Sequence, residues 1–501
     1  MNYAMIGYML GWVCCFEGGF LLLPLLVALI YGEMQVGAAY GIMAVLCLIL
    51  GAVVVWRKPK NTTIVAKDGL VIVALCWIVL SVFGAVPFTI SGEIPSYVDA
   101  LFETISGFTT TGSSILSNVE VMSHAGLFWR SFTHWVGGMG VLVFILAILP
   151  MKGGSSMFLM KAESPGPSVN KLVPRIRTTA MTLYAIYIAM TVLEGILLLM
   201  GGMPLFDTIC TCFGTAGTGG FGIKNDSFGS YSRYLQSVVA IFMMLFGVNF
   251  NFYYLILKKK YSQAKESVEV WAYFGIILIA TVLIAWCIYP RIGSGGEAVQ
   301  QSFFQVSTII TTTGFASADF NQWPALARTI LVTLMFIGAC AGSTGGGIKV
   351  SRILIMLEGV RKELGLIAHP RSVRKVKLDG RTVEHDVVRS VNSFITIYLV
   401  IFAFSILIIS LDEKDLVTNF TAVAATLNNI GPGLEIVGPA GNFESFSNLS
   451  KCVLMFDMLA GRLELLPMLV LFVPSTWKKK HVRKEGSEKK TAVRHKILKR
   501  A

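Results

Sequence analysis

Four segments of this chain place a glycine directly after hydroxyl, amide or other small residues, each between long apolar stretches. They are Thr109-Thr110-Thr111-Gly112-Ser113, Thr218-Gly219-Gly220-Phe221, Thr311-Thr312-Thr313-Gly314-Phe315 and Asn428-Asn429-Ile430-Gly431-Pro432. Successive key glycines lie 108, 94 and 117 residues apart. Glycine gives a backbone the freedom to line a narrow space with its carbonyl groups, and a ring of carbonyls can replace the hydration shell of a cation. The pattern therefore indicates an ion pore whose ring is supplied by one chain.

Close helix packing is an alternative role for these small residues. Glycine, serine and threonine let membrane helices approach one another, and for a single cluster this role would be favoured. Four clusters at repeating positions favour the pore instead. Threonine and asparagine add side-chain oxygens to the carbonyl oxygens, which suits potassium. We find no nucleophile–base pair and no metal-ligand spacing of histidine and cysteine, which argues against an enzyme.

The composition of the chain is that of a membrane protein. Hydrophobic residues make up 54% and charged residues 14% of it, whereas soluble domains contain about 25% charged residues. The first apolar stretch lacks the basic start of a cleavable signal, so we predict a permanent helix there. A requirement of about 20 apolar residues per crossing predicts ten spans, at residues 6–30, 36–56, 68–90, 127–150, 178–200, 234–257, 269–289, 326–348, 391–411 and 450–474.

Four intervals between these spans are too long for simple loops and too short or too polar to cross a bilayer. They are residues 95–115, 203–223, 296–317 and 415–434. Non-helical backbone at membrane depth is tolerated only where protein buries it or where it lines a cavity. We therefore predict a half-helix, a glycine turn and an extended return in each interval. The predicted fold is all-α: a two-helix hairpin followed by four repeats of span, re-entrant hairpin and span around a central pore.

Basic residues are concentrated in alternate connections. Of the 42 Lys and Arg residues, 34 lie in residues 57–67, 152–177, 258–265, 349–389 and 478–500. The positive-inside rule places these segments in the cytoplasm, with both termini inside and the four hairpins entering from outside. The net charge of +13 then reflects membrane topology, and we expect no nucleic-acid partner.

A second glycine-rich stretch occupies the end of the predicted span 326–348. Residues 338–347 contain five glycines, followed by Ile348 and Lys349. The stretch resembles a phosphate-binding loop only superficially, because Ile348 separates the last glycine from the lysine and no strand precedes it. Each glycine costs a helix about 1 kcal/mol relative to alanine. We therefore predict a broken helix with a mobile middle below the third glycine segment; a close helix-packing face is the alternative.

Arg462 is a basic residue inside the last predicted span. At a helix centre such a residue costs about 2.5–3.5 kcal/mol and usually faces a polar interior. Glu464 lies two positions away, on a different helix face, so no pair within the helix is expected. A position facing the pore, or hydrogen bonds to carbonyls of residues 342–347, would account for Arg462; snorkelling is the alternative. His134, beside aromatic residues, is more typical of a packed histidine than of a titrating one.

The four span–hairpin–span units with single key glycines resemble the Trk/Ktr/HKT superfamily of potassium transporters. The amino-terminal hairpin and the length resemble the bacterial Trk transmembrane subunit most, and the resemblance covers nearly the whole chain. It implies a potassium-selective pore, with potassium as substrate and no organic cofactor on this chain. It further implies a homodimer in the lipid bilayer of the bacterial inner membrane, working with a cytosolic nucleotide-binding regulatory subunit.

The resemblance also implies roles for particular residues. The implied potassium-binding filter comprises Thr110, Thr111, Gly112 and Ser113; Thr218, Gly219, Gly220 and Phe221; Thr312, Thr313, Gly314 and Phe315; and Asn429, Ile430, Gly431 and Pro432. The implied gate is an intramembrane loop, Gly342, Ser343, Thr344, Gly345, Gly346 and Gly347, with Lys349 and Arg462. Two adjacent glycines leave the register of the second filter segment open by one residue. The fourth segment has Asn-Asn-Ile instead of hydroxyl residues, although this too resembles the family's fourth filter segment.

These expectations divide the chain into seven parts. They are the hairpin 1–60, pore repeats 61–150, 151–262, 263–360 and 391–475, a cytoplasmic bridge 361–390 between the third and fourth repeats, and a basic tail 476–501. The bridge mixes charges of both signs with apolar residues, which suits docking to another protein. Two alternatives for function remain open: a sodium- or proton-coupled potassium symporter, and the pore subunit of a potassium-pumping ATPase.

Overall fold

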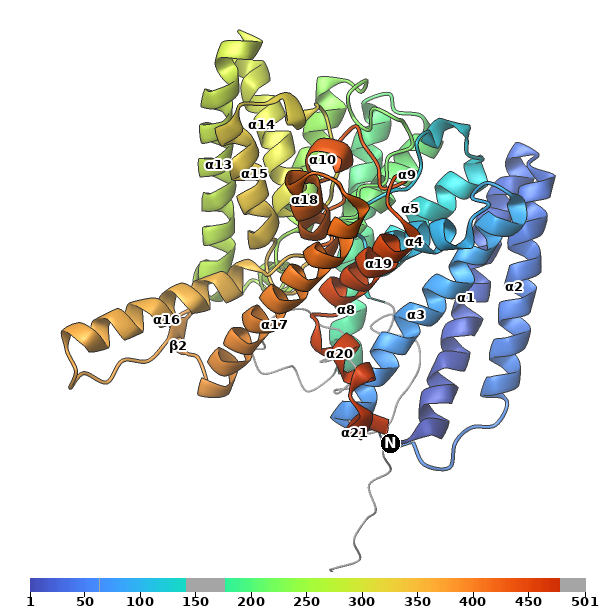
Figure 1. The fold of residues 1–501 in the computed structure, drawn as a ribbon, viewed down its shortest axis with the longest axis horizontal. Coiled ribbons are helices and arrows are strands. Elements are labelled where there is room, and N and C mark those ends of the chain that lie inside the picture. The colour runs from blue at the N-terminus through green and yellow to red at the C-terminus, as the bar shows by residue number, and fades with distance from the viewer. Residues whose placement is uncertain (63, 141–175, 478–501) are drawn as a thin grey trace, which may run out of the picture.

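The computed structural model describes residues 1–62, 64–140 and 176–477. Its first element is an antiparallel hairpin of α1 (Tyr3–Tyr31) and α2 (Met34–Val55). Gly32 ends α1 in the left-handed conformation, with φ of 76°, which glycine adopts without strain. The two helices pack mainly on each other and on α3, and form one flank of the molecule (Figure 1). This matches the predicted amino-terminal hairpin.

The remainder of the described chain repeats one arrangement four times. A long helix comes first: α3 (Ala66–Ser91), α8 (Ile176–Met200), α13 (Val268–Ile292) and α17 (His385–Ile409). A short helix follows: α4 (Tyr97–Phe108), α9 (Leu205–Gly217), α14 (Gly295–Ile310) and α18 (Leu416–Leu427). Each short helix leads into a non-helical return, which we call a return segment: residues 109–114, 218–222, 311–316 and 428–433. The predicted half-helices and extended returns are therefore present.

The helix after each return segment is short or interrupted. These helices are α5 (His124–Met139), α10 (Arg233–Phe246) with α11 (Phe250–Leu257), α15 (Ala325–Ile337) with α16 (Val350–Ala368), and α19 (Asn448–Arg462) with α20 (Leu466–Phe472). The axes of α10 and α11 differ by 88°. In the described residues, six helices are long and apolar enough to cross a membrane, or seven if this bent pair is one span.

Four predicted spans are therefore not continuous helices in the part of the chain that is described. One of them, 234–257, breaks between α10 and α11, so the prediction of one uninterrupted helix there was wrong. The span 326–348 ends as a helix at Ile337, which confirms the expected interruption by glycine. The span 450–474 breaks after Arg462, where Glu464 and Leu465 have positive φ, so the prediction of one uninterrupted helix there was wrong. Of the span 127–150, α5 ends at Met139, and residues 141–150 lie outside the described part. Hydropathy averaged over the length of a span does not register these breaks, because apolar residues lie on both sides of each break.

A small unit protrudes from the body of the molecule. Helix α16 extends away from the bundle, and a two-stranded ribbon of β1 (Lys377–Leu378) and β2 (Arg381–Thr382) folds back beneath it (Figure 1). Its apolar core joins α16, the ribbon and the start of α17 through Ile355, Val376, Leu378, Val383 and Val391. The remaining short elements are α12 (Tyr261–Lys265), α21 (Pro474–Trp477) and 3-10 turns at Val119–Val121, Phe320–Gln322, Ser410–Asp412 and Glu435–Val437.

Candidate functional site

The four return segments follow one backbone path. Their key glycines have φ of 81°, 76°, 90° and 98°, at Gly112, Gly220, Gly314 and Gly431 respectively. The residue two positions earlier also has positive φ in each case: Thr110, Thr218, Thr312 and Asn429, at 53° to 59°. Positive φ is uncommon for residues other than glycine, so its repetition at matching positions defines the alignment. The register left open in the second segment is thereby fixed, with Gly220 equivalent to the other three glycines.

The return segments meet one another in cyclic order. A Cβ atom on each key glycine would meet a backbone oxygen of the next segment. That oxygen belongs in every case to the residue before the next key glycine. The distances are 2.0 Å from Gly112 to Gly219, 1.9 Å from Gly220 to Thr313, 2.2 Å from Gly314 to Ile430, and 3.0 Å from Gly431 to Thr111. Contacts under 3.0 Å leave no room for a side chain, so three of these positions require glycine for space as well as for φ.

The four return segments thus form a ring, and side-chain hydrogen bonds stabilise it both within a segment and between segments. The hydroxyl oxygens of Thr109 and Thr111 lie 2.7 Å apart, and those of Thr311 and Thr313 lie 2.8 Å apart. Asn429 Nδ2 donates to Thr111 Oγ1 at 2.9 Å, which joins the fourth segment to the first. These hydroxyl groups bond to protein, whereas Thr110 Oγ1 and Asn429 Oδ1 have no hydrogen-bond partner among the described residues. Within the described residues, no cluster of histidine, cysteine and carboxylate side chains is arranged to hold a metal ion.

A cavity of about 180 Å³ opens on one side of the ring. All four key glycines line it, together with Ser113, Phe221, Pro432 and other residues of the return segments. Its wall is predominantly polar. The predicted filter residues are thus brought together around one space, although they come from positions more than 300 residues apart in the sequence.

The glycine-rich loop (residues 338–349) lies against the third and fourth return segments. Gly346 N–H donates to Thr312 Oγ1 at 2.5 Å. Gly347 N–H donates to the carbonyl oxygen of Asn428 at 3.0 Å. A Cβ on Gly345 would lie 2.8 Å from the carbonyl oxygen of Thr311. The predicted position next to the third segment is therefore observed, and contact with the fourth segment is added.

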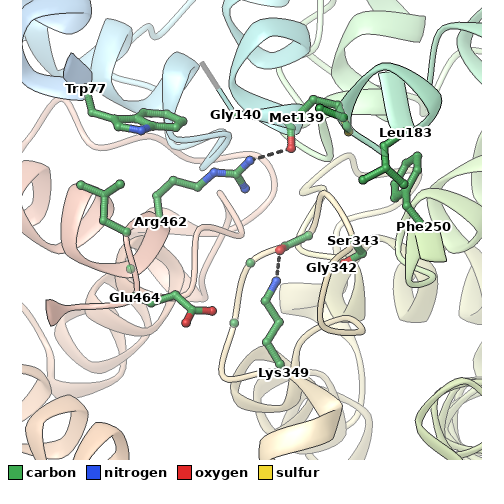
Figure 2. A pocket seen from close by; sticks show the side chains of 17 residues that line it. Trp77, Met139, Gly140, Leu183, Phe250, Gly342, Ser343, Lys349, Arg462 and Glu464 are labelled. Carbon is green, nitrogen blue, oxygen red and sulfur yellow. Dashed lines mark hydrogen bonds between the residues drawn. The ribbon is translucent and has the colours of Figure 1, made fainter. Parts of the chain in front are cut away.

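Two basic residues hold this loop (Figure 2). Arg462 Nη1 donates to the carbonyl oxygen of Thr344 at 2.8 Å. Its Nη2 donates to the carbonyl oxygen of Gly138 at 2.9 Å. Lys349 Nζ donates to the carbonyl oxygen of Gly345. Both side chains line a cavity of about 100 Å³. The hydrogen bond from Arg462 to residues 342–347 was one of the two arrangements expected for this arginine.

The position of Arg462 in its helix differs from the expectation. It is the last residue of α19 rather than a residue at the centre of a span. The following Glu464 pairs with Arg352 in the first turn of α16, which agrees with the absence of a pair within the helix. The end of α19 thus contacts the loop through one arginine and α16 through one glutamate.

The break between α10 and α11 also binds the loop. Cys340 N–H donates to the carbonyl oxygen of Gly247 at 3.1 Å, and Phe250 N–H donates to that of Gly342 at 3.0 Å. A helix break exposes backbone groups that a continuous helix would use internally, and here the loop satisfies them. Sequence reasoning placed an unbroken span there. The available signal was Gly247, followed two residues later by the capping residue Asn249.

Sequence reasoning also gave little weight to α5. His134 is fully buried, and its ring contacts both the first short helix and the second return segment. Arg130, one turn earlier, was not singled out, yet it forms a buried ion pair with Glu103. The available signal was the spacing of four residues, which places both side chains on one helix face.

Comparison with known proteins gives a consistent result. The family described as "TrkH: Cation transport protein" matches residues 38–289 and 292–480. The Trk system potassium uptake protein TrkH of Salmonella typhimurium is 37% identical over 487 residues, covering 95% of this chain and all of that protein. TrkG of Escherichia coli K12 is 33% identical, covering 91% of this chain and 94% of TrkG. The crystal structure of the potassium transporter TrkH from Vibrio parahaemolyticus superposes with a TM-score of 0.84 at 32% identity, covering 95% of this chain and all of that one.

Proposed function

This chain belongs to the TrkH family of cation transport proteins, and we propose that it carries potassium into the cell through the ring of four return segments. The observation that carries the proposal is the cyclic contact of each key glycine with the backbone carbonyl preceding the next one. Carbonyl oxygens held in a ring can replace the hydration shell of a cation. Seven of the sixteen filter residues implied by the resemblance line the cavity beside this ring, which supports the proposal: Gly112, Ser113, Gly220, Phe221, Gly314, Gly431 and Pro432.

The electrical potential across the membrane is sufficient to drive such uptake. A monovalent cation gains about 2.3 kcal/mol per 100 mV when it moves toward an interior at negative potential. The ion would leave the polar cavity, pass the four carbonyls and reach the glycine-rich loop. We expect one coordinating layer per segment, and therefore looser discrimination against sodium than a longer filter gives.

We further propose that residues 342–347, with Lys349 and Arg462, form the gate. The support is direct contact of the loop with Thr312 and Asn428 in the return segments. Arg462 fixes the loop to the carbonyl of Gly138 at the end of α5. A loop held by a few hydrogen bonds rather than by a packed helix can move aside at modest cost.

The protruding unit of α16 and its ribbon is our proposed docking site for a cytosolic nucleotide-binding regulatory subunit. The ribbon and the last part of α16 lie in the predicted bridge 361–390, and α16 begins directly after the loop. Arg352, in the first turn of α16, pairs with Glu464 at the end of α19. A regulator that displaced α16 would therefore act on the loop in two ways: through the direct chain connection to α16, and through the ion pair of Arg352 with Glu464 at the end of α19. The homodimer and the division into hairpin 1–60, four repeats, bridge and tail 476–501 remain parts of this proposal; residues 478–501 lie outside the described part.

The proposed orientation follows the positive-inside rule. In Figure 1 the N-terminus and α21 lie at the bottom and α16 projects to the lower left; this lower side would face the cytoplasm of a bacterial inner membrane. The cavity above the ring would then open to the outside.

Flux into liposomes tests the function. Purified protein should pass potassium down its gradient without ATP and without sodium or a proton gradient. A strict need for sodium or protons would favour the symporter, and a need for ATP and a further catalytic chain would favour the pump subunit. Absence of potassium flux under all of these conditions would overturn the proposal.

A further inference from the structure

One face of α5 touches both the first and the second return segments. His134 and Arg130 lie four residues apart on this face, and both are buried. The helix approaches its neighbours at backbone contact: a Cβ on Gly137 would lie 1.9 Å from the carbonyl oxygen of Phe108, and a Cβ on Gly138 would lie 2.6 Å from Cα of Gly217. Helix α5 is therefore wedged between the ends of α4 and α9.

His134 bridges the two repeats with both ring nitrogens. Nδ1 lies 2.8 Å from the carbonyl oxygen of Gly107 in α4, and the backbone N–H of Phe221 donates to Nε2 at 3.2 Å. Because a carbonyl can only accept and an amide N–H can only donate, Nδ1 carries the proton and the imidazole is neutral. The ring also packs on that of Phe221, with centroids 4.3 Å apart.

The same histidine accounts for an irregularity in the motif. The residue before the key glycine is Thr111, Thr313 or Ile430 in three segments, but Gly219 in the second. A Cβ on Gly219 would lie 2.1 Å from Nδ1 of His134. The imidazole occupies the space that a side chain fills in the other segments, so glycine is required there.

Arg130 holds the next residues of the same segment. It is paired with Glu103 of α4 at 2.7 Å, and both side chains are almost fully buried. Its guanidinium lies over the ring of Phe221, 4.1 Å from the centroid, and Nη1 donates to the carbonyl oxygen of Gly222 at 3.4 Å. Glu103 in turn accepts from the backbone N–H of Ile115 beyond the first return segment at 3.0 Å. The pair thus connects both return segments, and Glu103 neutralises the charge of Arg130, which lines the cavity beside the ring.

We propose that His134 and Arg130 are positioning residues, which set the second return segment against the first and thereby tune cation selectivity. The inference rests on the proposed potassium pathway. Neither side chain need touch the ion. Each acts through Phe221 and Gly222, which follow Gly220 in the chain. The position of Gly220 in the ring depends on where the backbone of these two residues is held.

The test compares three substitutions of the histidine in protein purified from membranes. H134F keeps a ring but loses both hydrogen bonds. H134Q can place an amide oxygen near the position of Nε2 and accept from Phe221, whereas H134N can place only its donor near Gly107. The first measurement is potassium and sodium uptake into liposomes. The second is the rise in unfolding temperature that potassium causes, compared with the rise that sodium causes, since an ion that binds the folded protein stabilises it.

H134F and H134N both lose the hydrogen bond from Phe221 N–H. The proposal expects each to lower the potassium-to-sodium uptake ratio by about five-fold to ten-fold, the size expected for the loss of that one buried hydrogen bond. H134Q should retain most of the ratio. The potassium-specific temperature shift should fall in the same order. Equal ratios for wild type, H134F and H134N would overturn the proposal, and so would equal loss in all three variants.

Two further variants keep the test decisive if H134F is poorly folded. G219A should accumulate poorly because of the clash with the imidazole, and H134A/G219A should recover accumulation; no recovery would contradict the assigned steric role. E103Q leaves Arg130 uncompensated and should slow potassium uptake, whereas E297Q, in the exposed Arg233–Glu297 pair, should not. Equal rates for E103Q and wild type would count against Arg130. If wild-type protein passes no potassium, the proposed function fails; if wild type and G314S differ in selectivity but the α5 variants do not, only this inference fails.

Discussion

Gly346 N–H donates a hydrogen bond of 2.5 Å to the hydroxyl oxygen of Thr312. The glycine-rich loop is therefore attached to a return segment itself and not merely located near it. Thr312 has positive φ, so the segment and the loop share a residue whose backbone is already in an uncommon conformation. A movement of the loop must change the surroundings of this threonine, which couples the proposed gate to the proposed filter.

The first prediction concerns the ring. G314S should weaken discrimination between potassium and sodium, because its Cβ would lie 2.2 Å from the carbonyl oxygen of Ile430 and serine at a φ of 90° is strained. Relative uptake of the two ions into liposomes measures the effect. G275S is the matched control, since a Cβ there meets no atom within 4 Å. An unchanged ratio in correctly inserted G314S protein would remove Gly314 from the filter.

The second prediction concerns the gate. R462A should raise basal potassium flux, because the loop loses the hydrogen bond at Thr344 and its link to Gly138. Deletion of residues 345–347 should act in the same direction. R57A, at an exposed arginine between α2 and α3, serves as the control. Ordinary or reduced flux in both folded gate variants would contradict the role of the loop.

The third prediction concerns pH and the amino-terminal hairpin. Glu33 accepts from the backbone N–H groups of His124 and Ala125 at the start of α5, at 2.8 and 3.0 Å. Burial raises the pKa of Glu33, but these hydrogen bonds and the His124 imidazole outweigh it, so the net pKa is lowered. A lowered pKa stabilises the fold above the unfolded value, near 4.3, and this stabilisation is lost as pH falls through the folded value.

E33Q should therefore lower the unfolding temperature at pH 7, by the equivalent of about 0.5–1 kcal/mol after solvent screening. The difference from wild type should shrink as pH falls below about 4. Thermal unfolding in detergent at several pH values measures this. E444Q, at an exposed glutamate, should show neither effect. A difference that is constant over the whole pH range would show that charge at Glu33 is unimportant.

The fourth prediction concerns the regulatory partner. K375E/K377E should weaken binding of the cytosolic subunit and the response to its nucleotide, because both lysines are exposed on the protruding unit. Arg374 is a less suitable target: its guanidinium lies against Gly365, with Nη1 2.2 Å from a hypothetical Cβ there. Pull-down and nucleotide-dependent flux measure the effect, with K58E as an exposed control. Intact binding by K375E/K377E would reject this surface.

Local sequence features were enough to predict much of the architecture. Apolar length predicts spans because a bilayer has a fixed thickness, and the glycine segments predict the interrupted hairpins because non-helical backbone needs special residues. Residues 338–349 were expected to break a helix for the same local reason, and the break at Ile337 confirms it. The four repeats and their key glycines could be predicted from the sequence, except for the register of the second return segment.

Tertiary structure decided the features that depend on distant neighbours. Gly220 rather than Gly219 occupies the ring. Thr313, 93 residues away, packs against Gly220, and His134, 85 residues away, packs against Gly219. Helix α19 ends at Arg462 although apolar residues continue, and the guanidinium there binds carbonyls of α5 and the loop. Composition and hydrophobic periodicity indicate how a segment of the chain interacts with lipid or with water. They carry no information about which distant backbone group fills the space beside it, and in this protein that choice sets the register and the ends of the helices.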